Sequence, residues 1–270
     1  MSELASSSMA WIGLLLVVGG LSLAPFAAYV ARRIFPGRNV FFARWGFSHV
    51  LLLVGIGLFV SPMPWLVAFA LPLDTPPILR QLVGSAFHFA LLGTCVLIWA
   101  VRLDPSGWRC LGLWKGRHLR ALGCACASYV LLFPALQGAN FLWPWLLERL
   151  GGDFGLQEVM LGLGELQGSH LVWGIVLAVL VQPFFEELLF RSFLQPLLVQ
   201  NLGDKGGVSA TSFLFALLHG AQAFLPIFAL SLVIGAVMLR TQRLAAAWAI
   251  HAINNGLTIA LLLTFREQLA

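Results

Sequence analysis

The residues most able to do chemistry in this chain lie inside stretches that are otherwise apolar. Within "VQPFFEELLFRSF", residues 181–193, two adjacent carboxylates, Glu186 and Glu187, precede Arg191. The ten residues before this stretch, "LVWGIVLAVL", would suit the middle of a lipid bilayer. A charged side chain at that depth costs about 3 kcal/mol on insertion scales, so such residues usually face the interior of a helix bundle and serve a function.

Helical spacing separates the two carboxylates. Glu187 and Arg191 stand four residues apart with the acid first, which is the favourable order for an ion pair along a helix. Glu186 points about 100° away from Glu187 around the helix, and it is therefore not matched to the arginine of its own helix. We expect Glu187 and Arg191 to form a supporting ion pair and Glu186 to face other polar groups.

Two later apolar segments supply imidazole and amide groups. Phe215 and His219 stand four residues apart and share one helix face. His251 and Asn255 have the same spacing, whereas Asn254 lies off that face.

These groups fall at similar depths in the membrane. At the helical rise per residue, Glu186 lies roughly 20 Å from the cytoplasmic end of its segment. His219 lies roughly 15–20 Å, and His251 with Asn255 roughly 10–20 Å, from the cytoplasmic ends of theirs. Three segments of alternating direction would therefore bring a carboxylate, two imidazoles and an amide to one level.

Such a set can hydrolyse a peptide bond. A carboxylate in an apolar site can act as a general base, a histidine can help hold the water, and histidine and amide groups can donate hydrogen bonds to an oxyanion. Two alternatives use the same residue types. Transporters also gather Glu and His at mid-membrane for proton or cation passage. Alternatively, Glu186, His219 and His251 could bind a catalytic zinc ion together with a water.

The composition requires a membrane protein. The chain has 270 residues, of which 60% are hydrophobic and 10% charged, whereas a soluble domain carries about 25% charged residues. Spans of about 20 mostly apolar residues indicate helices as the crossing units. We therefore predict an all-α, polytopic protein with about eight transmembrane helices and a polar active site inside the membrane. The eight segments cover residues 9–31, 47–71, 82–101, 119–144, 170–199, 208–221, 224–239 and 244–264.

The basic residues are distributed unevenly between the loops. Three lie on one side of the membrane, Arg191 lies within the fifth segment, and the other twelve lie on the opposite side. Those twelve are Arg32, Arg33, Arg38, Arg44, Arg102, Arg109, Lys115, Arg117, Arg120, Lys205, Arg240 and Arg243. This bias makes the twelve-residue side cytoplasmic and places both termini outside the cytoplasm. The formal net charge of +5 is thus a topology signal, and we expect no nucleic-acid partner.

Three motifs in this order resemble those of a known family. "EELLFR" at 186–191 reads as EExxxR, "FALLH" at 215–219 as FxxxH, and "HAINN" at 251–255 as HxxxN. They resemble the CPBP, or Abi, family of intramembrane proteases, which includes type II CAAX-prenyl endopeptidases and bacterial bacteriocin-processing or immunity proteins. The resemblance covers roughly residues 181–262, and the preceding segments share only their hydrophobic character with the family.

The resemblance implies a role for each matching residue. Glu186 would be the general base, and His219 would work with it on the water. His251 and Asn255 would stabilise the oxyanion. Glu187, Arg191 and Phe215 would be supporting residues. The family implies a glutamate mechanism that needs no metal, so we expect no cofactor and keep zinc as the alternative.

These observations predict an intramembrane endopeptidase of the plasma (inner) membrane. Residues 1–168 would form the variable N-terminal helices and residues 169–270 the catalytic core of a single membrane domain. The partners would be the lipid bilayer and a membrane-associated or exported peptide or protein, such as a bacteriocin leader, a lipidated peptide or a sorting tail. The alternatives are a non-enzymatic immunity or scaffold factor and a proton-coupled transporter.

Overall fold

A computed structural model describes residues 3–36, 43–104, 107–113, 116–151 and 158–269, and this part of the chain is helical without any strand. Arg38 and Lys115, two of the predicted topology signals, lie outside the described residues. The α-helices are α1 (Glu3–Ser22), α2 (Ala24–Ile34), α3 (Phe47–Phe59), α4 (Met63–Ala70), α5 (Pro77–Leu103), α6 (Gly107–Cys110), α7 (His118–Arg149), α8 (Glu158–Glu165), α9 (Gly168–Ile175), α10 (Gln182–Glu187), α11 (Gln195–Leu218), α12 (Phe224–Thr241) and α13 (Leu244–Leu269). Two π-helical segments, η1 (Val176–Val181) and η2 (Leu188–Leu194), and a 3₁₀ turn, η3 (Ala221–Ala223), complete the set.

The chain divides into two compact units, each built from three separate stretches. Unit 1 comprises Met1–Val40, Lys115–Gly155 and Leu198–Ile250. Unit 2 comprises Phe41–Trp114, Leu156–Leu197 and His251–Ala270. The two carboxylates and the HxxxN motif therefore belong to unit 2, whereas the FxxxH motif belongs to unit 1.

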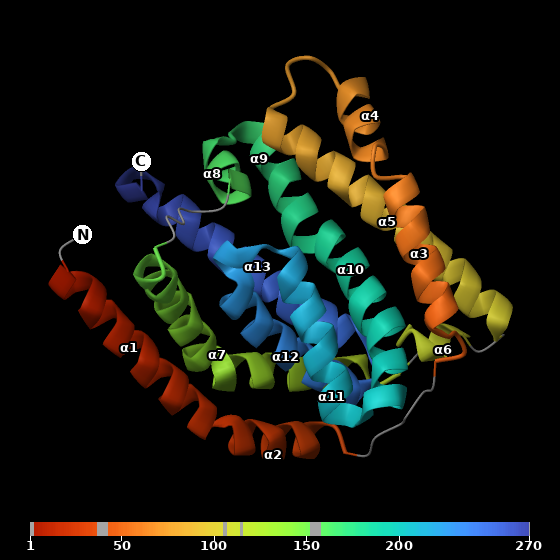
Figure 1. Ribbon diagram of the computed structural model, residues 1–270, viewed down its shortest axis with the longest axis horizontal. Coiled ribbons are helices and arrows are strands. Elements are labelled where there is room, and N and C mark those ends of the chain that lie inside the picture. Colours follow the sequence, from red (N-terminus) through yellow and green to blue (C-terminus); the bar gives the residue numbers. More distant parts are fainter. Residues whose placement is uncertain (1–2, 37–42, 105–106, 114–115, 152–157, 270) are drawn as a thin grey trace. The chain divides into compact units, whose positions relative to one another are not determined.

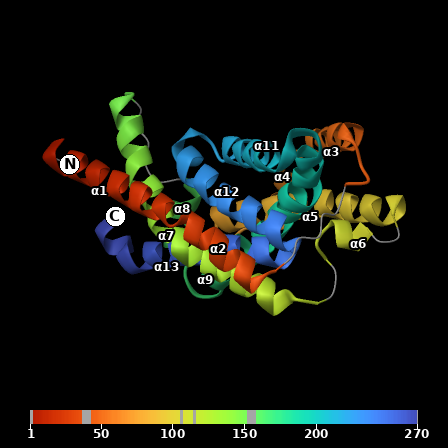
Figure 2. The same cartoon turned by 90° about the horizontal axis from the view of Figure 1, so that it is seen from below.

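In unit 1, the long helix α7 is the common support. Helices α1 and α2 lie along it and α12 packs on it (Figures 1 and 2). The core between these helices and the start of α13 contains Tyr129, Ile234, Met238 and Ile250. The approach of α1 to α7 is close because small residues meet there, as is common between membrane helices. A Cβ on Gly20 would lie 2.3 Å from the backbone nitrogen of Ala135.

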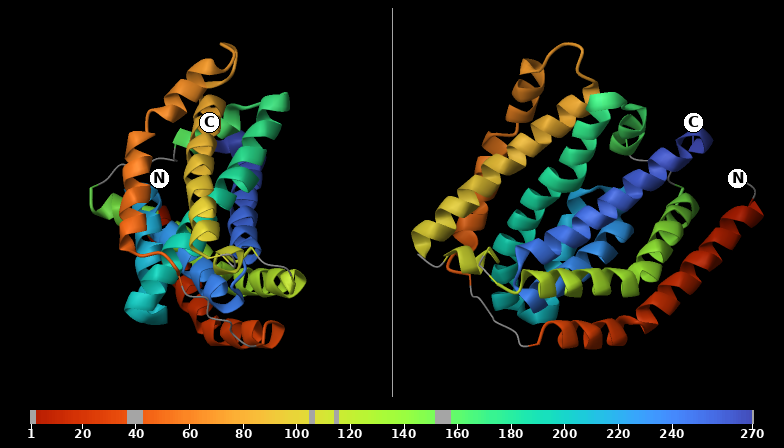
Figure 3. Two further views of the ribbon diagram at one scale, coloured as in Figure 1. Left: turned by 90° about the vertical axis from the view of Figure 1, so that its right-hand side faces the viewer. Right: turned by 180° about the vertical axis from the view of Figure 1, so that it is seen from behind.

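In unit 2, α5 is the central helix. The short helices α3 and α4 lie beside it (Figure 3), and it also contacts α9, η1, α10 and η2. Leu82 of α5 joins Leu163, Leu166, Ile259 and Leu262 in a buried cluster that includes residues of α8 and α13. This packing holds the helix that carries the carboxylates against the helix that carries His251.

Several described helices are suited to a membrane. Five helical stretches are long and apolar enough to cross one, and two bent pairs of helices raise the number to seven. The chain is thus an integral membrane protein, as predicted. Each of the first two predicted segments is in fact a bent pair with a 42° turn. The bends occur where prolines interrupt the helix, at Pro25 in the first pair and at Pro62 and Pro64 in the second.

Two other boundaries differ from the sequence prediction. Helix α7 continues through Pro134 and Pro144 to Arg149, although we predicted that it ends at residue 144. The fifth and sixth predicted segments lie in one helical run of 51 residues, Gly168–Leu218, interrupted by non-helical backbone at Gly203. Gly203 has a φ of 72°, which a glycine adopts without strain.

Arg243 lies in the loop between α12 and α13, as predicted, but its side chain is fully buried. Its Nε and Nη2 atoms donate to the carbonyl of Gly116 at 3.0 and 2.7 Å. Arg243 therefore ties the start of α13 to the segment before α7, within unit 1.

The contact between α1 and α7 generates a test of the fold. We expect Gly20→Ala to lower the free energy of unfolding by about 1–3 kcal/mol, because the new methyl group would overpack the backbone of α7. Gly19→Ala is the matched control, because a Cβ there meets nothing within 4 Å. Thermal unfolding in detergent compares the two, and equal midpoints would contradict the close packing of α1 on α7.

Candidate active site

Glu186 and Glu187 lie on a short α-helical turn, α10, between two π-helical segments. Each π segment is followed directly by a Gln-Pro pair, Gln182–Pro183 after η1 and Gln195–Pro196 after η2. Proline has no N–H and its ring clashes with the carbonyl four residues earlier, so a regular α-helix is disfavoured just before it. Widening to i→i+5 bonds relieves the clash, and such π turns are frequent at functional sites. The two prolines thus set the register of the carboxylates.

Glu187 and Arg191 form the ion pair that the spacing predicted. The Nε atom of Arg191 lies 3.1 Å from Oε2 of Glu187, and both side chains are completely buried. Removing both charges from water costs free energy, so each charge is stable in the interior only when it is paired with the other.

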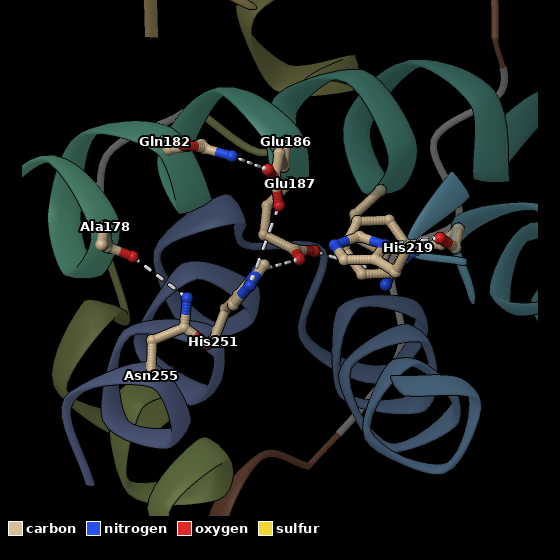
Figure 4. Close-up of polar contacts among 9 residues, drawn as sticks. Ala178, Gln182, Glu186, Glu187, His219, His251 and Asn255 are labelled. Atoms are coloured by element: carbon tan, nitrogen blue, oxygen red, sulfur yellow. Dashed lines mark hydrogen bonds and ion pairs between the residues drawn. The ribbon is translucent and has the colours of Figure 1, made fainter. Parts of the chain in front are cut away.

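Glu187 has a second partner that the sequence did not reveal. Its Oε1 accepts a hydrogen bond of 2.8 Å from Nδ1 of His251 (Figure 4). A carboxylate paired with a guanidinium is ionised and can only accept, so the proton of this bond belongs to Nδ1. The bond fixes the ring of His251 so that its other nitrogen, Nε2, lies 3.8 Å from Oε2 of Glu186. That separation is longer than a hydrogen bond.

Glu186 is buried, with 5% of its surface exposed, and Gln182 holds it. The Nε2 atom of Gln182 donates to Oε1 of Glu186 at 2.9 Å (Figure 4). Our sequence reasoning overlooked Gln182, although its position four residues before Glu186 was a visible signal. Because Gln182 occupies Oε1, the other oxygen is the one that faces His251.

The amide of Asn255 binds the backbone of the helix opposite. Its Nδ2 donates to the carbonyl oxygen of Ala178 in η1 at 3.0 Å (Figure 4). His251 and Asn255, which share one face of α13, therefore both contact the run that contains the carboxylates.

A glycine on α5 supports this arrangement from another side. A Cβ on Gly93 would come within 2.7 Å of the ring of Phe185 and 3.2 Å of the side chain of Leu188. These two residues flank the Glu186–Glu187 pair. Gly93 thus allows α5 to pack directly against the turn that carries the carboxylates.

His219 and Phe215 lie in unit 1, and the predicted approach of His219 to Glu186 stays a prediction. His219 follows the last residue of α11, where helix carbonyls lack donors of their own. Its Nδ1 lies 2.7 Å from the carbonyl oxygen of Phe215. Since a carbonyl only accepts, Nδ1 carries the proton and a neutral ring keeps Nε2 as an acceptor. The ring also packs on that of Phe215, with 4.5 Å between centroids.

A metal centre was the alternative interpretation. Among the residues described, no group of three or more His, Cys, Asp or Glu side chains is arranged to hold a metal ion. Which of the two mechanisms operates stays a prediction.

The helices and this cluster together define a class of protein. The chain is a helical integral membrane protein in which one membrane-suited run carries two buried carboxylates, one of them bound to a buried histidine.

Comparison with known proteins gives a family resemblance for part of the chain. Residues 168–257 match the family model described as type II CAAX prenyl endopeptidase Rce1-like. This stretch begins at α9 and contains all three motifs, so this part of the chain is similar to the CAAX protease-like family. The match confirms the resemblance drawn from the motifs. No curated protein and no solved structure matches the chain significantly.

The buried charges generate a test of the site. We expect Arg191→Met to destabilise the protein by about 3–5 kcal/mol, because Glu187 would remain buried without its guanidinium. The double variant Glu187→Gln, Arg191→Met should lose less, since no unbalanced charge remains and the amide oxygen of the new glutamine can still accept from His251. Thermal unfolding in detergent measures both.

Arg33→Met is the control for loss of one positive charge, because Arg33 is exposed and should change stability by no more than about 0.5 kcal/mol. A double variant that is less stable than Arg191→Met alone would show that the pair is not balanced as described.

Proposed function

We propose that this protein is an intramembrane endopeptidase that hydrolyses a peptide bond with a water activated by Glu186. The observation that carries the proposal is that the two carboxylates have different binding partners. Glu187 is neutralised by Arg191 and bound to His251, whereas Glu186 has one oxygen held by Gln182 and the other facing an imidazole. One acid is thus structural, and the other remains available to accept a proton.

Glu186 would take a proton from water as the resulting hydroxide attacks the peptide carbonyl carbon. When the tetrahedral intermediate collapses, the C–N bond breaks and the proton passes from Glu186 to the leaving amine. His219 would help to hold the water, a role assigned from the FxxxH motif. The tautomer set by the Phe215 carbonyl supports it, because a neutral His219 presents Nε2 as an acceptor for a water proton.

His251 and Asn255 would stabilise the oxyanion. Because Nδ1 of His251 is occupied by Glu187, the ring can donate through Nε2 only when both nitrogens are protonated. Charge balance favours that state in a buried site: two carboxylates and one guanidinium leave one negative charge, which an imidazolium neutralises. A primary amide has two N–H groups, so Asn255 keeps one donor beyond its bond to Ala178.

The finer topology is also proposed. The run Gly168–Leu218 has 51 residues, or about 75 Å of helix, against a hydrocarbon core of about 30 Å. A run of that length is too long for one crossing, and Gly203 divides it near the boundary between the two predicted segments. Counting it as two crossings supports eight spans in all, with both termini outside the cytoplasm of a plasma (inner) membrane. We assign catalysis to residues 169–270 and regard residues 1–168 as the variable part.

The substrate would be a peptide or protein within or beside the bilayer. The name of the matching family points to prenylated C-terminal CAAX peptides as the first candidates. Bacteriocin leaders, other lipidated peptides and C-terminal sorting tails have the same membrane-proximal character and belong in the same screen.

The central test is Glu186→Gln. We expect it to lower kcat for peptide cleavage by about 10²–10⁴-fold, because an amide cannot accept the proton from water. Purified protein in liposomes should be incubated with prenylated CAAX peptides and with precursors that accumulate in a deletion strain. Glu165→Gln is the matched control, because Glu165 is exposed on α8 and should cleave as the unmodified protein does. Wild-type turnover by Glu186→Gln would end the proposal, and full rescue of a deletion phenotype by this variant would favour a scaffold or immunity role.

The glutamate mechanism makes a separate prediction about metal. We expect the purified enzyme to cleave without stoichiometric zinc and to keep its rate during a chelator titration. Elemental analysis and initial rates measure this. Loss of activity on chelation that added zinc restores would instead support a zinc site formed by Glu186, His219 and His251.

A further inference from the structure

The carbonyl of Ala178 lacks the donors that a helix normally provides. In an α-helix the donor would be the N–H of Gln182, but that group binds the carbonyl of Leu177, five residues back. In the π register of η1 the donor would come from residue 183, which is a proline without an N–H. The Pro183 ring that widens the helix thus also leaves this carbonyl without its intrahelical bond.

An unsatisfied carbonyl is costly in a membrane-suited run. Lipid offers no hydrogen bonds, and helices with proline therefore rely on side chains of neighbouring helices to bind the freed backbone groups. The amide of Asn255 does this, with Nδ2 at 3.0 Å from the Ala178 oxygen (Figure 4). The bond joins α13 to η1 within unit 2.

We propose that Asn255 is a positioning residue as well as an oxyanion donor: it replaces the donor that Pro183 removes, and so holds the π register that places Gln182 and Glu186. The bonded carbonyl is four residues before Gln182, and Gln182 is four residues before Glu186. A shift of η1 would therefore be transmitted through Gln182 to the catalytic carboxylate. The effect on catalysis rests on the proposed function, whereas the effect on stability does not.

Pro183 and Asn255 should consequently be coupled, and a double-mutant cycle can measure the coupling. Asn255→Leu keeps a similar shape without a donor. Pro183→Ala restores an N–H at the position from which a π-helix would bind Ala178. The four proteins of the cycle would be compared by thermal unfolding in detergent and by kcat and KM for a cleaved peptide.

We expect Asn255→Leu to lower the unfolding midpoint by about 2–10 °C in the natural background, as for a buried polar group left unpaired. In the Pro183→Ala background the same substitution should lower it by less than half as much. The loss of kcat on Asn255→Leu should likewise be about tenfold smaller in the Pro183→Ala background, with KM little changed. The part of the loss that remains is the oxyanion role.

Pro134→Ala is the control background, because Pro134 is also inside a helix but lies in unit 1. Its effect should add to that of Asn255→Leu without coupling. Equal midpoint shifts in the natural and Pro183→Ala backgrounds would overturn the proposal. Coupled midpoints with equal losses of kcat would overturn the positioning of Glu186. If no protein of the cycle, including the unmodified one, cleaves any peptide in the screen, the proposed function fails, and the midpoints alone decide whether Asn255 replaces the missing donor.

Discussion

The carboxylate of Glu187 is shared between a guanidinium and an imidazole, and the rest of the site depends on this arrangement. One oxygen lies against Arg191 on the same helix, and the other binds His251 on α13. All three groups are buried, so each must have its partner for the others to remain charged or hydrogen-bonded. The ring of His251 is oriented by this carboxylate, and its other nitrogen, Nε2, faces Glu186 as a result. An acid that orients a histidine toward a third group is a common arrangement in proteins.

The backbone contributes as much as the side chains. Two Gln-Pro pairs bracket the turn that carries the carboxylates, and each is preceded by a π-helical segment. The first glutamine then holds Glu186. A single short stretch of sequence therefore encodes the register, the restraint on the acid and the neighbouring ion pair. What it cannot supply is the donor for Ala178, which comes from a residue 77 positions later.

The sequence was sufficient for the features that depend on local periodicity. Apolar runs predicted the membrane helices, and the spacing of Glu187 and Arg191 predicted their ion pair. It was insufficient where long-range packing decides the outcome. Nothing in the spacing of the "EELLFR" motif indicates that Glu187 also binds His251, because that contact depends on how α13 packs against α10. Helix α7 passes through Pro144, which we predicted as its end, because neighbouring helices can support a freed backbone group in a membrane. The burial of Arg243 could not be predicted, because its contact with the carbonyl of Gly116 joins residues far apart in the sequence.

The order of residues along the chain has a consequence for biosynthesis. Unit 2 includes His251–Ala270, so during synthesis the run with Glu186 and Glu187 reaches the membrane before His251, which binds Glu187, has been made. Each exposed carboxylate would oppose insertion by about 3 kcal/mol. Arg191, one turn away in the same helical run, enters the membrane with them and can neutralise Glu187 from the start. The intrahelical ion pair thus serves the nascent protein first, by letting an acidic helix enter the bilayer, and the finished site afterwards.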